Sequence, residues 1–264
     1  MRFKKFIICT WSIAVLTLSV TTWATEPERP TFSADIALLS KYIWRGFELS
    51  DNGIVIEPSA TFGFKGFTMN LWGNLDTDYN DGDPDTSDGS NWTETDWTLA
   101  YERAFGPVTL GLGYIYYGLD SADDTQEFYF SAAWDVLLSP TLTIYRDVSA
   151  MPSWYFNFGI SHAFALPKDI TLNLSGSVAY YYSIDEDFVS VDDNLNPTTS
   201  EYRAFHNGLL SVDLAIPFAK YFTVSPVLSY SFPLSNEASN LIKSTSYNDA
   251  SSFLYGGIII SAAF

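Results

Sequence analysis

Residues 170–182 read ITLNLSGSVAYYY, and apolar and polar side chains alternate along most of this stretch. One phase carries isoleucine, leucine and valine, and the other carries threonine, asparagine and serine. Successive side chains of a strand point to opposite faces, so a period of two predicts a β-strand with one apolar face. Residues 67–76 and 222–232 repeat the pattern. The sequence therefore predicts an all-β protein.

Twelve such segments follow one another, each about ten residues long. We predict strands at 34–46, 54–64, 67–77, 94–104, 107–118, 125–137, 140–148, 153–164, 169–183, 202–216, 221–232 and 252–264. The connections after the even-numbered strands are tight, whereas those after the odd-numbered strands are mostly longer and polar, as in 78–94, 184–200 and 233–251. Short turns at one end and long loops at the other are typical of transmembrane β-barrels.

The N-terminus has the features of a secretory signal peptide. Basic Arg2, Lys4 and Lys5 precede an apolar stretch from Phe6 to about residue 20, and small residues end at Ala24. An N-terminal membrane anchor is the alternative, but the apolar stretch is shorter than the roughly 20 residues a spanning helix needs. We therefore predict a signal peptide over 1–24 and one β-barrel domain over 25–264. The single cysteine, Cys9, lies in the signal peptide, so the mature chain has no disulfide framework.

The mature chain is strongly acidic. Without Arg2, Lys4 and Lys5, ten basic residues face 31 acidic ones, a formal charge of −21. Nucleic acid is excluded as a partner because phosphate binding requires the opposite charge. An exported soluble β protein and an outer-membrane barrel both remain, since a soluble barrel also alternates along its strands. Strand length, even strand number, loop asymmetry and the signal peptide together favour an up-and-down antiparallel barrel in the Gram-negative outer membrane.

The C-terminal residues YGGIIISAAF (255–264) continue the alternation to the last position. A closed barrel pairs its last strand with its first, because lipid offers no water to an open edge. We therefore expect an ordered, outward-facing Phe264. Such a terminal aromatic is similar to the signal that outer-membrane assembly machinery recognises, which makes Phe264 the candidate assembly signal. Four tryptophans are expected on the apolar face near strand ends, as in an aromatic girdle: Trp44, Trp97, Trp134 and Trp154.

Residues 40–53, SKYIWRGFELSDNG, carry Tyr42, Arg45 and Gly46 in a Tyr-x-x-Arg-Gly motif before a polar turn. This opening resembles that of a poorly characterised family of Gram-negative outer-membrane β-barrel proteins. Residues 71–76, 111–120 and 145–161 are similar to later parts of the same family. The resemblance implies the barrel and its location, and it implies no activity.

Charged residues also occupy the polar phase of the predicted strands, where they face the lumen. These candidate pore-lining residues are Lys41, Arg45, Glu57, Asp76, Asp96, Glu102, Glu127, Asp135 and Asp213. A lattice of salt bridges between strands would explain them, because buried charges must be paired. A water-filled pore would explain them too, and its excess of carboxylates would favour cations. A barrel of eight strands is filled by its own side chains and one of sixteen or more contains a channel, so twelve strands leave the state of the lumen open. Six bulky side chains expected to face inward could narrow it: Trp72, Tyr117, Tyr129, Tyr181, Phe205 and Tyr255.

Other chemistry has little support in the sequence. Residues 76–89 superficially resemble a calcium loop, but Asp81 and Ser87 stand where an EF-hand requires glycine and glutamate. His162 and His206, the only histidines, lie in no nucleophile motif and make a poor zinc site. We therefore predict no enzyme activity, no metal site and no cofactor.

The sequence as a whole predicts a narrow passive channel for small solutes or cations. A closed structural or docking barrel that holds a periplasmic partner is the alternative. The expected partners are outer-membrane lipid, lipopolysaccharide and the assembly machinery, with divalent cations at the acidic loops as a further candidate.

Overall fold

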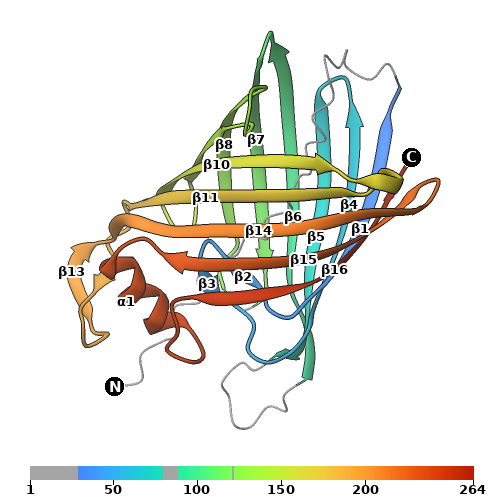
Figure 1. Ribbon diagram of the computed structural model, residues 1–264. Helices are drawn as coiled ribbons and strands as arrows, with labels where there is room; N and C mark the ends of the chain where they lie inside the picture. Colours follow the sequence, from blue (N-terminus) through green and yellow to red (C-terminus); the bar gives the residue numbers. More distant parts are fainter. Residues whose placement is uncertain (1–28, 80–88, 121) are drawn as a thin grey trace.

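The computed structural model describes residues 29–79, 89–120 and 122–264, and within these residues twelve antiparallel strands form a closed barrel (Figure 1). The predicted signal peptide, 1–24, lies outside the described residues. The barrel strands, in chain order, are β1 (Thr31–Leu39), β4 (Val55–Phe64), β5 (Phe67–Tyr79), β6 (Gly89–Phe105), β7 (Val108–Leu119), β8 (Thr125–Trp134), β9 (Thr141–Asp147), β10 (Ser153–Ala165), β11 (Thr171–Ser183), β14 (Arg203–Ala219), β15 (Phe222–Pro233) and β16 (Phe253–Ala263).

Each barrel strand pairs with its sequence neighbours in the barrel, and β1 closes the circle by pairing with β16. Ile36 lies opposite Ile260 in this last pair. The backbone N–H of Phe264 donates to the carbonyl oxygen of Phe32 at 2.9 Å, which keeps the final residue ordered. The predicted all-β, up-and-down, twelve-stranded barrel is confirmed.

The two faces of the wall separate apolar from polar side chains as predicted. On the outward face Phe67, Leu112 and Leu254 are each more than 60% exposed. On the inward face Tyr117 and Tyr181 are each 1% exposed. Large apolar side chains are normally buried away from water. A barrel whose outer surface carries many of them is therefore suited to an apolar environment.

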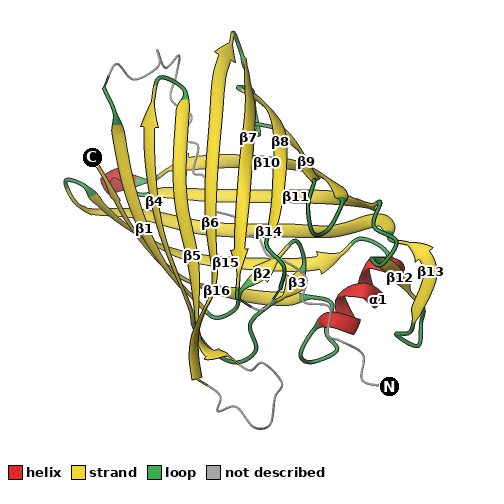
Figure 2. Ribbon diagram, turned by 180° about the vertical axis from the view of Figure 1, so that it is seen from behind, coloured by secondary structure: helices red, strands yellow, loops and turns green. Residues whose placement is uncertain are grey.

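The first predicted strand is too long at its C-terminal end. The prediction extends it to residue 46, but β1 ends at Leu39, and Leu39 lies directly opposite Val55 of β4. Residues 40–54 therefore leave the wall between two paired residues and fold into the barrel, where β2 (Ile43–Trp44) and β3 (Phe47–Glu48) form a small hairpin (Figures 1 and 2). We call residues 40–54 the plug.

The hairpin turn explains two residues of the Tyr-x-x-Arg-Gly motif. Trp44 pairs with Phe47, and the two residues between them have positive φ, 45° at Arg45 and 88° at Gly46. This is the backbone shape that tight two-residue hairpins require, and glycine adopts it most easily. A Cβ on Gly46 would lie 3.0 Å from the Cβ of Asn207 in β14, so the turn is also pressed against the barrel wall.

Three further elements lie at the barrel end that carries the long connections 184–202 and 234–252, which we call the long-loop end. They are β12 (Val189–Val191), β13 (Pro197–Glu201) and the helix α1 (Asn236–Thr245), gathered at one end of the barrel in Figure 2. At the opposite, short-turn end the 3₁₀ turn η1 (Pro167–Asp169) connects β10 and β11. None of the helices in the described residues is long and apolar enough to span a membrane.

Helix α1 was not expected, because 233–251 has the composition of a polar loop. Ser235 caps its N-terminus by accepting a hydrogen bond from the Ala238 N–H at 3.1 Å. Ala238, Leu241 and Ile242 are 0–4% exposed and join the core. Their i, i+3, i+4 spacing is the signal that could have predicted the helix.

The core lies inside the barrel at the long-loop end, where the plug packs against the wall and α1. Its buried members include Tyr42, Trp44, Phe47, Trp72, Tyr155, Phe188, Tyr202 and Leu241. The expectation that Trp44 belongs to an outward girdle is therefore wrong. Its side chain is 2% exposed in the lumen, whereas Trp97, Trp134 and Trp154 are 47, 36 and 37% exposed on the outward face.

One predicted inward side chain also faces outward. Phe205 is 63% exposed, and the following residue, His206, is fully buried. The pairing of β11 with β14 shifts register between Val178 and Tyr180. A bulge of this kind inverts the alternation beyond it, so Phe205 and Asp213 do not share a face although both positions are odd.

Candidate functional site: the plugged lumen

The plug is anchored at its tip by an ion pair to the barrel wall. Arg45 Nη1 donates to Oε1 of Glu127 at 3.0 Å, and Nη2 donates to Oε2 at 2.8 Å. The two side chains are only 5 and 3% exposed. Tyr117 also donates to the Glu127 carboxylate, at 3.1 Å. Two parallel charge-assisted hydrogen bonds make this a strong interaction. Removal of either partner would leave the other charge buried without compensation, which is strongly destabilising.

Aromatic rings surround the same guanidinium. The Cζ atom of Arg45 lies 4.2 Å from the ring centre of Tyr155, 4.6 Å from that of Trp44 and 4.8 Å from that of Tyr145. Tyr155 and Tyr145 belong to neighbouring wall strands, β10 and β9. The electron-rich faces of aromatic rings attract a cation. The wall therefore binds the Arg45 guanidinium through the rings of Tyr145 and Tyr155 as well as through Glu127.

The base of the plug has a second set of polar anchors. The Tyr42 hydroxyl donates to Glu94 at 3.0 Å, and the Tyr42 N–H donates to Ser50 Oγ at 2.7 Å. Lys41 forms an ion pair with Glu48 within the plug. Glu48 also accepts from the backbone N–H of Tyr247, in the loop after α1, at 3.2 Å. Burial raises the pKa of the Tyr247 hydroxyl to about 12.

The wall around the plug is acidic. Glu57, Asp76, Asp96 and Glu127, all predicted from the sequence, are buried on inward positions of β4, β5, β6 and β8. Sequence reasoning missed three further buried carboxylates: Glu48, Glu94 and Asp147. Glu94 and Asp147 stand on the polar phase of two predicted strands, so the same alternation rule could have found them. Glu48 could not be found that way, because it belongs to the plug.

The remaining predicted residues lie elsewhere. Glu102 and Asp213 are half-buried on β6 and β14, nearer the short-turn end, and Asp213 accepts a hydrogen bond from Asn173 at 2.8 Å. Asp135 is exposed in the turn after β8, which ends at Trp134 and not at residue 137 as predicted. Its placement on the lumen wall is therefore wrong. Lys41 and Arg45 are on the plug, not on the wall.

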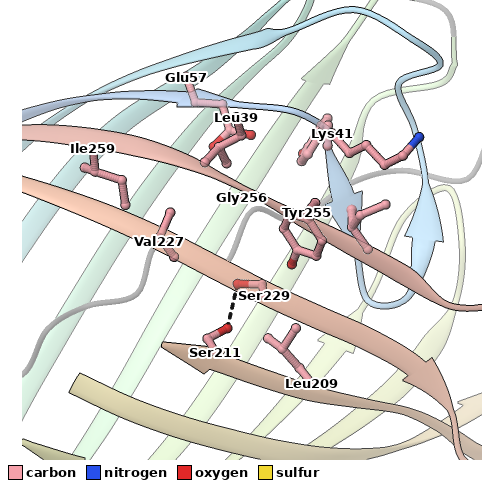
Figure 3. A pocket seen from close by; sticks show the side chains of 12 residues that line it. Leu39, Lys41, Glu57, Leu209, Ser211, Val227, Ser229, Tyr255, Gly256 and Ile259 are labelled. Carbon is pink, nitrogen blue, oxygen red and sulfur yellow. Dashed lines mark hydrogen bonds between the residues drawn. The ribbon is translucent and has the colours of Figure 1, made fainter. Parts of the chain in front are cut away.

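A cavity of about 50 Å³ lies beneath the plug. Leu39, Glu57, Tyr255 and the hydrogen-bonded Ser211–Ser229 pair are among the residues around it (Figure 3). A space of this size is large enough for water. Around this cavity, buried side chains of the plug, the wall and α1 pack together inside the long-loop end.

The half of the lumen toward the short turns has a different lining. Its inward positions carry small hydroxyl and amide side chains that are only half-buried, including Thr61, Asn70, Ser131, Thr143, Ser175 and Ser177. Asn70 donates to Ser59 and to Thr61, each at 2.8 Å, across the β4–β5 pair. Partial exposure of inward polar side chains means that water reaches this half of the barrel.

The two histidines do not form a common site. His206 is fully buried at the long-loop end, where its Nδ1 is 2.7 Å from the Tyr202 hydroxyl and its ring packs 4.9 Å from that of Phe47. His162 lies on β10 toward the short turns, against Phe164. The described residues contain no group of three or more His, Cys, Asp or Glu side chains placed to hold a metal ion.

Phe264 takes the outward position expected for it. It is 62% exposed, and its ring lies 5.2 Å from that of Tyr221 and 6.3 Å from that of Phe32. The assembly role assigned to it stays a prediction.

The fold and the lumen define a closed twelve-stranded β-barrel with an apolar outer wall and an internal plug. The chain belongs to the family described as "Bacterial protein of unknown function (Gcw_chp)", whose model matches residues 24–175. No curated protein matches the sequence.

Several solved structures are similar in overall arrangement. An outer membrane channel from Pseudomonas putida F1 is 8% identical with a TM-score of 0.42, covering 89% of this chain and 94% of its own. OmpF of Salmonella typhi is 8% identical with a TM-score of 0.40, covering 89 and 97%. A membrane protein from a study of in-meso crystallization is 10% identical with a TM-score of 0.47, covering 89 and 83%.

Proposed function

We propose that this protein is a cation-preferring channel of the Gram-negative outer membrane, closed in the present conformation by its plug. The outward belt of apolar side chains supports the membrane location, since such a wall would be unfavourable in water. The usual orientation of these barrels places the long-loop end outside the cell and the short turns in the periplasm. The proposal includes no catalytic role.

The observation that carries the channel proposal is the division of charge between plug and wall. Both basic residues of the lumen core, Lys41 and Arg45, belong to the plug, and the buried wall carboxylates belong to the barrel strands. If the plug moves out, it removes these two positive charges together with its own Glu48 and Asp51, and the carboxylates of the barrel strands remain in the lumen. Confined carboxylates raise the local concentration of cations and oppose the entry of anions.

The barrel does not depend on the plug for its closure. Leu39 and Val55 are direct partners in the β1–β4 pair, on either side of the plug. A tight hairpin turn could therefore connect the two strands with the register unchanged. The backbones of the two end residues, Ser40 and Ile54, bond to β16 and β5. Between these ends, the described contacts that hold the plug to the wall are side-chain hydrogen bonds and packing, and β2 and β3 form a sheet separate from the barrel. Movement of the plug is thus compatible with an intact wall.

Conductance of the purified protein in a planar bilayer tests the proposal. A variant in which an Asn-Gly turn replaces residues 41–53 should conduct steadily and select cations, whereas the wild type should be mostly closed. Arg45→Ala should open intermittently, because Glu127 then no longer holds the hairpin tip. Arg103→Ala, an arginine stacked on Phe105 near the short turns, is the matched control and should behave as wild type.

A closed docking barrel is the second candidate, and one observation favours it. The half of the lumen toward the short turns, which the proposed orientation turns to the periplasm, carries half-buried hydroxyl and amide groups to which a polar segment of a partner could bind. No conductance from the plug-deleted variant, with the barrel shown to be folded by heat-modifiable gel mobility, would reject the channel in favour of the docking barrel.

A further inference from the structure

Positive charge on the outward face at the long-loop end is confined to one row of residues. After the predicted signal peptide the chain has only ten basic residues. Lys41 and Arg45 are in the lumen, Lys243 is on α1, and five lie at or near the short-turn end: Arg29, Lys65, Arg103, Lys168 and Lys220. The two that remain, Arg146 and Arg203, both face outward at the long-loop end.

Arg146 and Arg203 stand in the same row across four adjacent strands. Arg146 of β9 lies opposite Trp154 of β10, Trp154 opposite Tyr182 of β11, and Tyr182 opposite Arg203 of β14. Their sequence neighbours Tyr145, Tyr155, Tyr181 and Ala204 are buried in or toward the lumen, so the row itself faces outward. We call Arg146, Trp154, Tyr182 and Arg203 the arginine row.

The aromatic side chains orient the two guanidinium groups. Arg146 Cζ lies 5.3 Å from the ring centre of Trp154, and Arg203 Cζ lies 4.2 Å from that of Tyr182. Arg146 also donates from Nη1 to the carbonyl oxygens of Asp147 and Ser153, at 2.6 and 3.2 Å. These contacts fix the arginine without neutralising it, since none of the ion pairs between described residues includes Arg146.

An apolar row lies directly beneath the arginine row on the same outward face. It consists of Ile144, Phe156, Tyr180 and Phe205, which are paired with one another in register. Phe156 stacks on Trp154 with ring centres 6.2 Å apart, and Tyr180 packs on Phe205 at 5.3 Å. Along the outward face, the arginines and their aromatic partners are followed by apolar side chains. This order matches a lipid, which has an anionic headgroup followed by acyl chains.

We propose that the arginine row binds the phosphate groups of an outer-leaflet glycolipid, with its acyl chains on the apolar row. Phosphate suits arginine because it accepts two parallel hydrogen bonds from one guanidinium. Three strand spacings separate the two arginines, about 14 Å, so each arginine binds a separate phosphate. The long-loop end faces the outside only if the orientation given under the proposed function holds, and the inference rests on that orientation.

Glu201 limits the site in its present state. It accepts a hydrogen bond from Arg203, and the two side chains are 34 and 41% exposed. An exposed pair of this kind contributes little stability, so a phosphate can displace the carboxylate. Glu201→Gln should therefore strengthen binding by removing the competitor, whereas loss of either arginine should weaken it.

Native mass spectrometry of the refolded mature protein with diphosphoryl lipid A tests the site. The wild type should bind the lipid, and Arg146→Gln with Arg203→Gln should lower the affinity about tenfold or more, as expected for lost charge-assisted hydrogen bonds. Arg103→Gln should have no effect, and Arg146→Lys should retain part of the binding. Equal binding by the double variant, or equal binding of fully dephosphorylated lipid A, would overturn the inference.

Further measurements distinguish failure of the lipid-binding proposal from failure of the channel proposal. Heat-modifiable mobility establishes that each variant is folded, and Glu201→Gln should bind more tightly than the wild type, a gain that misfolding cannot produce. Conductance of the plug-deleted barrel should be the same with and without the arginine substitutions. Lipid binding can therefore fail while the channel stands, and the channel can fail while lipid binding stands.

Discussion

Arg45 and Glu127 are 82 positions apart in the sequence, and the folded chain joins them by two parallel hydrogen bonds inside the barrel. Arg45 is at the tip of the plug, and Glu127 is on the wall strand β8. The pair therefore connects the plug to the barrel wall.

Loss of one partner of this pair should be more harmful than loss of both. Arg45→Ala should lower the free energy of unfolding by about 3–5 kcal/mol, because the Glu127 carboxylate is left buried without its cation. The double variant Arg45→Ala with Glu127→Gln should recover part of that loss. Urea unfolding followed by tryptophan fluorescence measures both, and strictly additive effects would contradict a direct interaction.

Replacement of Gly46 by alanine should destabilise the protein more than the same replacement of a glycine in a similar turn. Gly46→Ala should cost more than the roughly 1–2 kcal/mol of a left-handed alanine, because the new Cβ would also press on Asn207 and Ile242. Gly106, at φ +62°, is the matched control, because a Cβ added there would have no atom within 4 Å. Equal losses of unfolding free energy in the two variants would show that the close approach is unimportant.

Removal of Phe264 should impair membrane assembly more than export. The residue is exposed on the outward face beside Tyr221, so no buried contact of the barrel depends on its ring. Folded barrel, measured by heat-modifiable gel mobility, should fall, while signal-peptide cleavage should be unchanged. Phe264→Tyr keeps the aromatic ring and should assemble normally. Equal folded levels in the wild type and the deletion would reject the role.

Single cysteines can establish the orientation, since Cys9 is the only cysteine in the sequence and lies in the predicted signal peptide. Asn194→Cys, exposed in the turn between β12 and β13, should react with a membrane-impermeant maleimide added to whole cells. Lys168→Cys, in η1, should react only after the outer membrane is permeabilised. The reverse pattern would invert the barrel and remove the basis for the external lipid site.

Wall carboxylates should determine ion selectivity once the plug is absent. In the plug-deleted barrel, neutralising Asp76, Asp96, Glu127 and Asp147 together should reduce the cation preference measured by reversal potential. The preference should also weaken as added salt shortens the Debye length from ~10 Å at 0.1 M to ~3 Å at 1 M. Asp135→Asn, outside the lumen, is the control and should change nothing. Unchanged selectivity in the quadruple variant would place the selective region elsewhere.

The sequence by itself determined the wall of this protein. Alternation over 170–182 and its counterparts depends only on neighbouring residues, because successive side chains of a strand must face opposite ways. The same rule predicted the inward carboxylates Glu57, Asp76, Asp96 and Glu127. The pairing of the first and last strands was predicted because lipid offers no water to an open sheet edge. The alternation rule failed where alternation breaks locally, as at Phe205 beyond the bulge.

The tertiary structure alone decided what occupies the lumen. Residues 40–48 continue the apolar and polar composition of β1, so no local signal distinguishes a plug from more wall. Only the register of the β1–β4 pair, in which Leu39 lies opposite Val55, forces residues 40–54 off the sheet. Arg45 then meets Glu127, and Trp44 faces the core and not lipid, because contacts between distant segments exist only after the strands have closed around them.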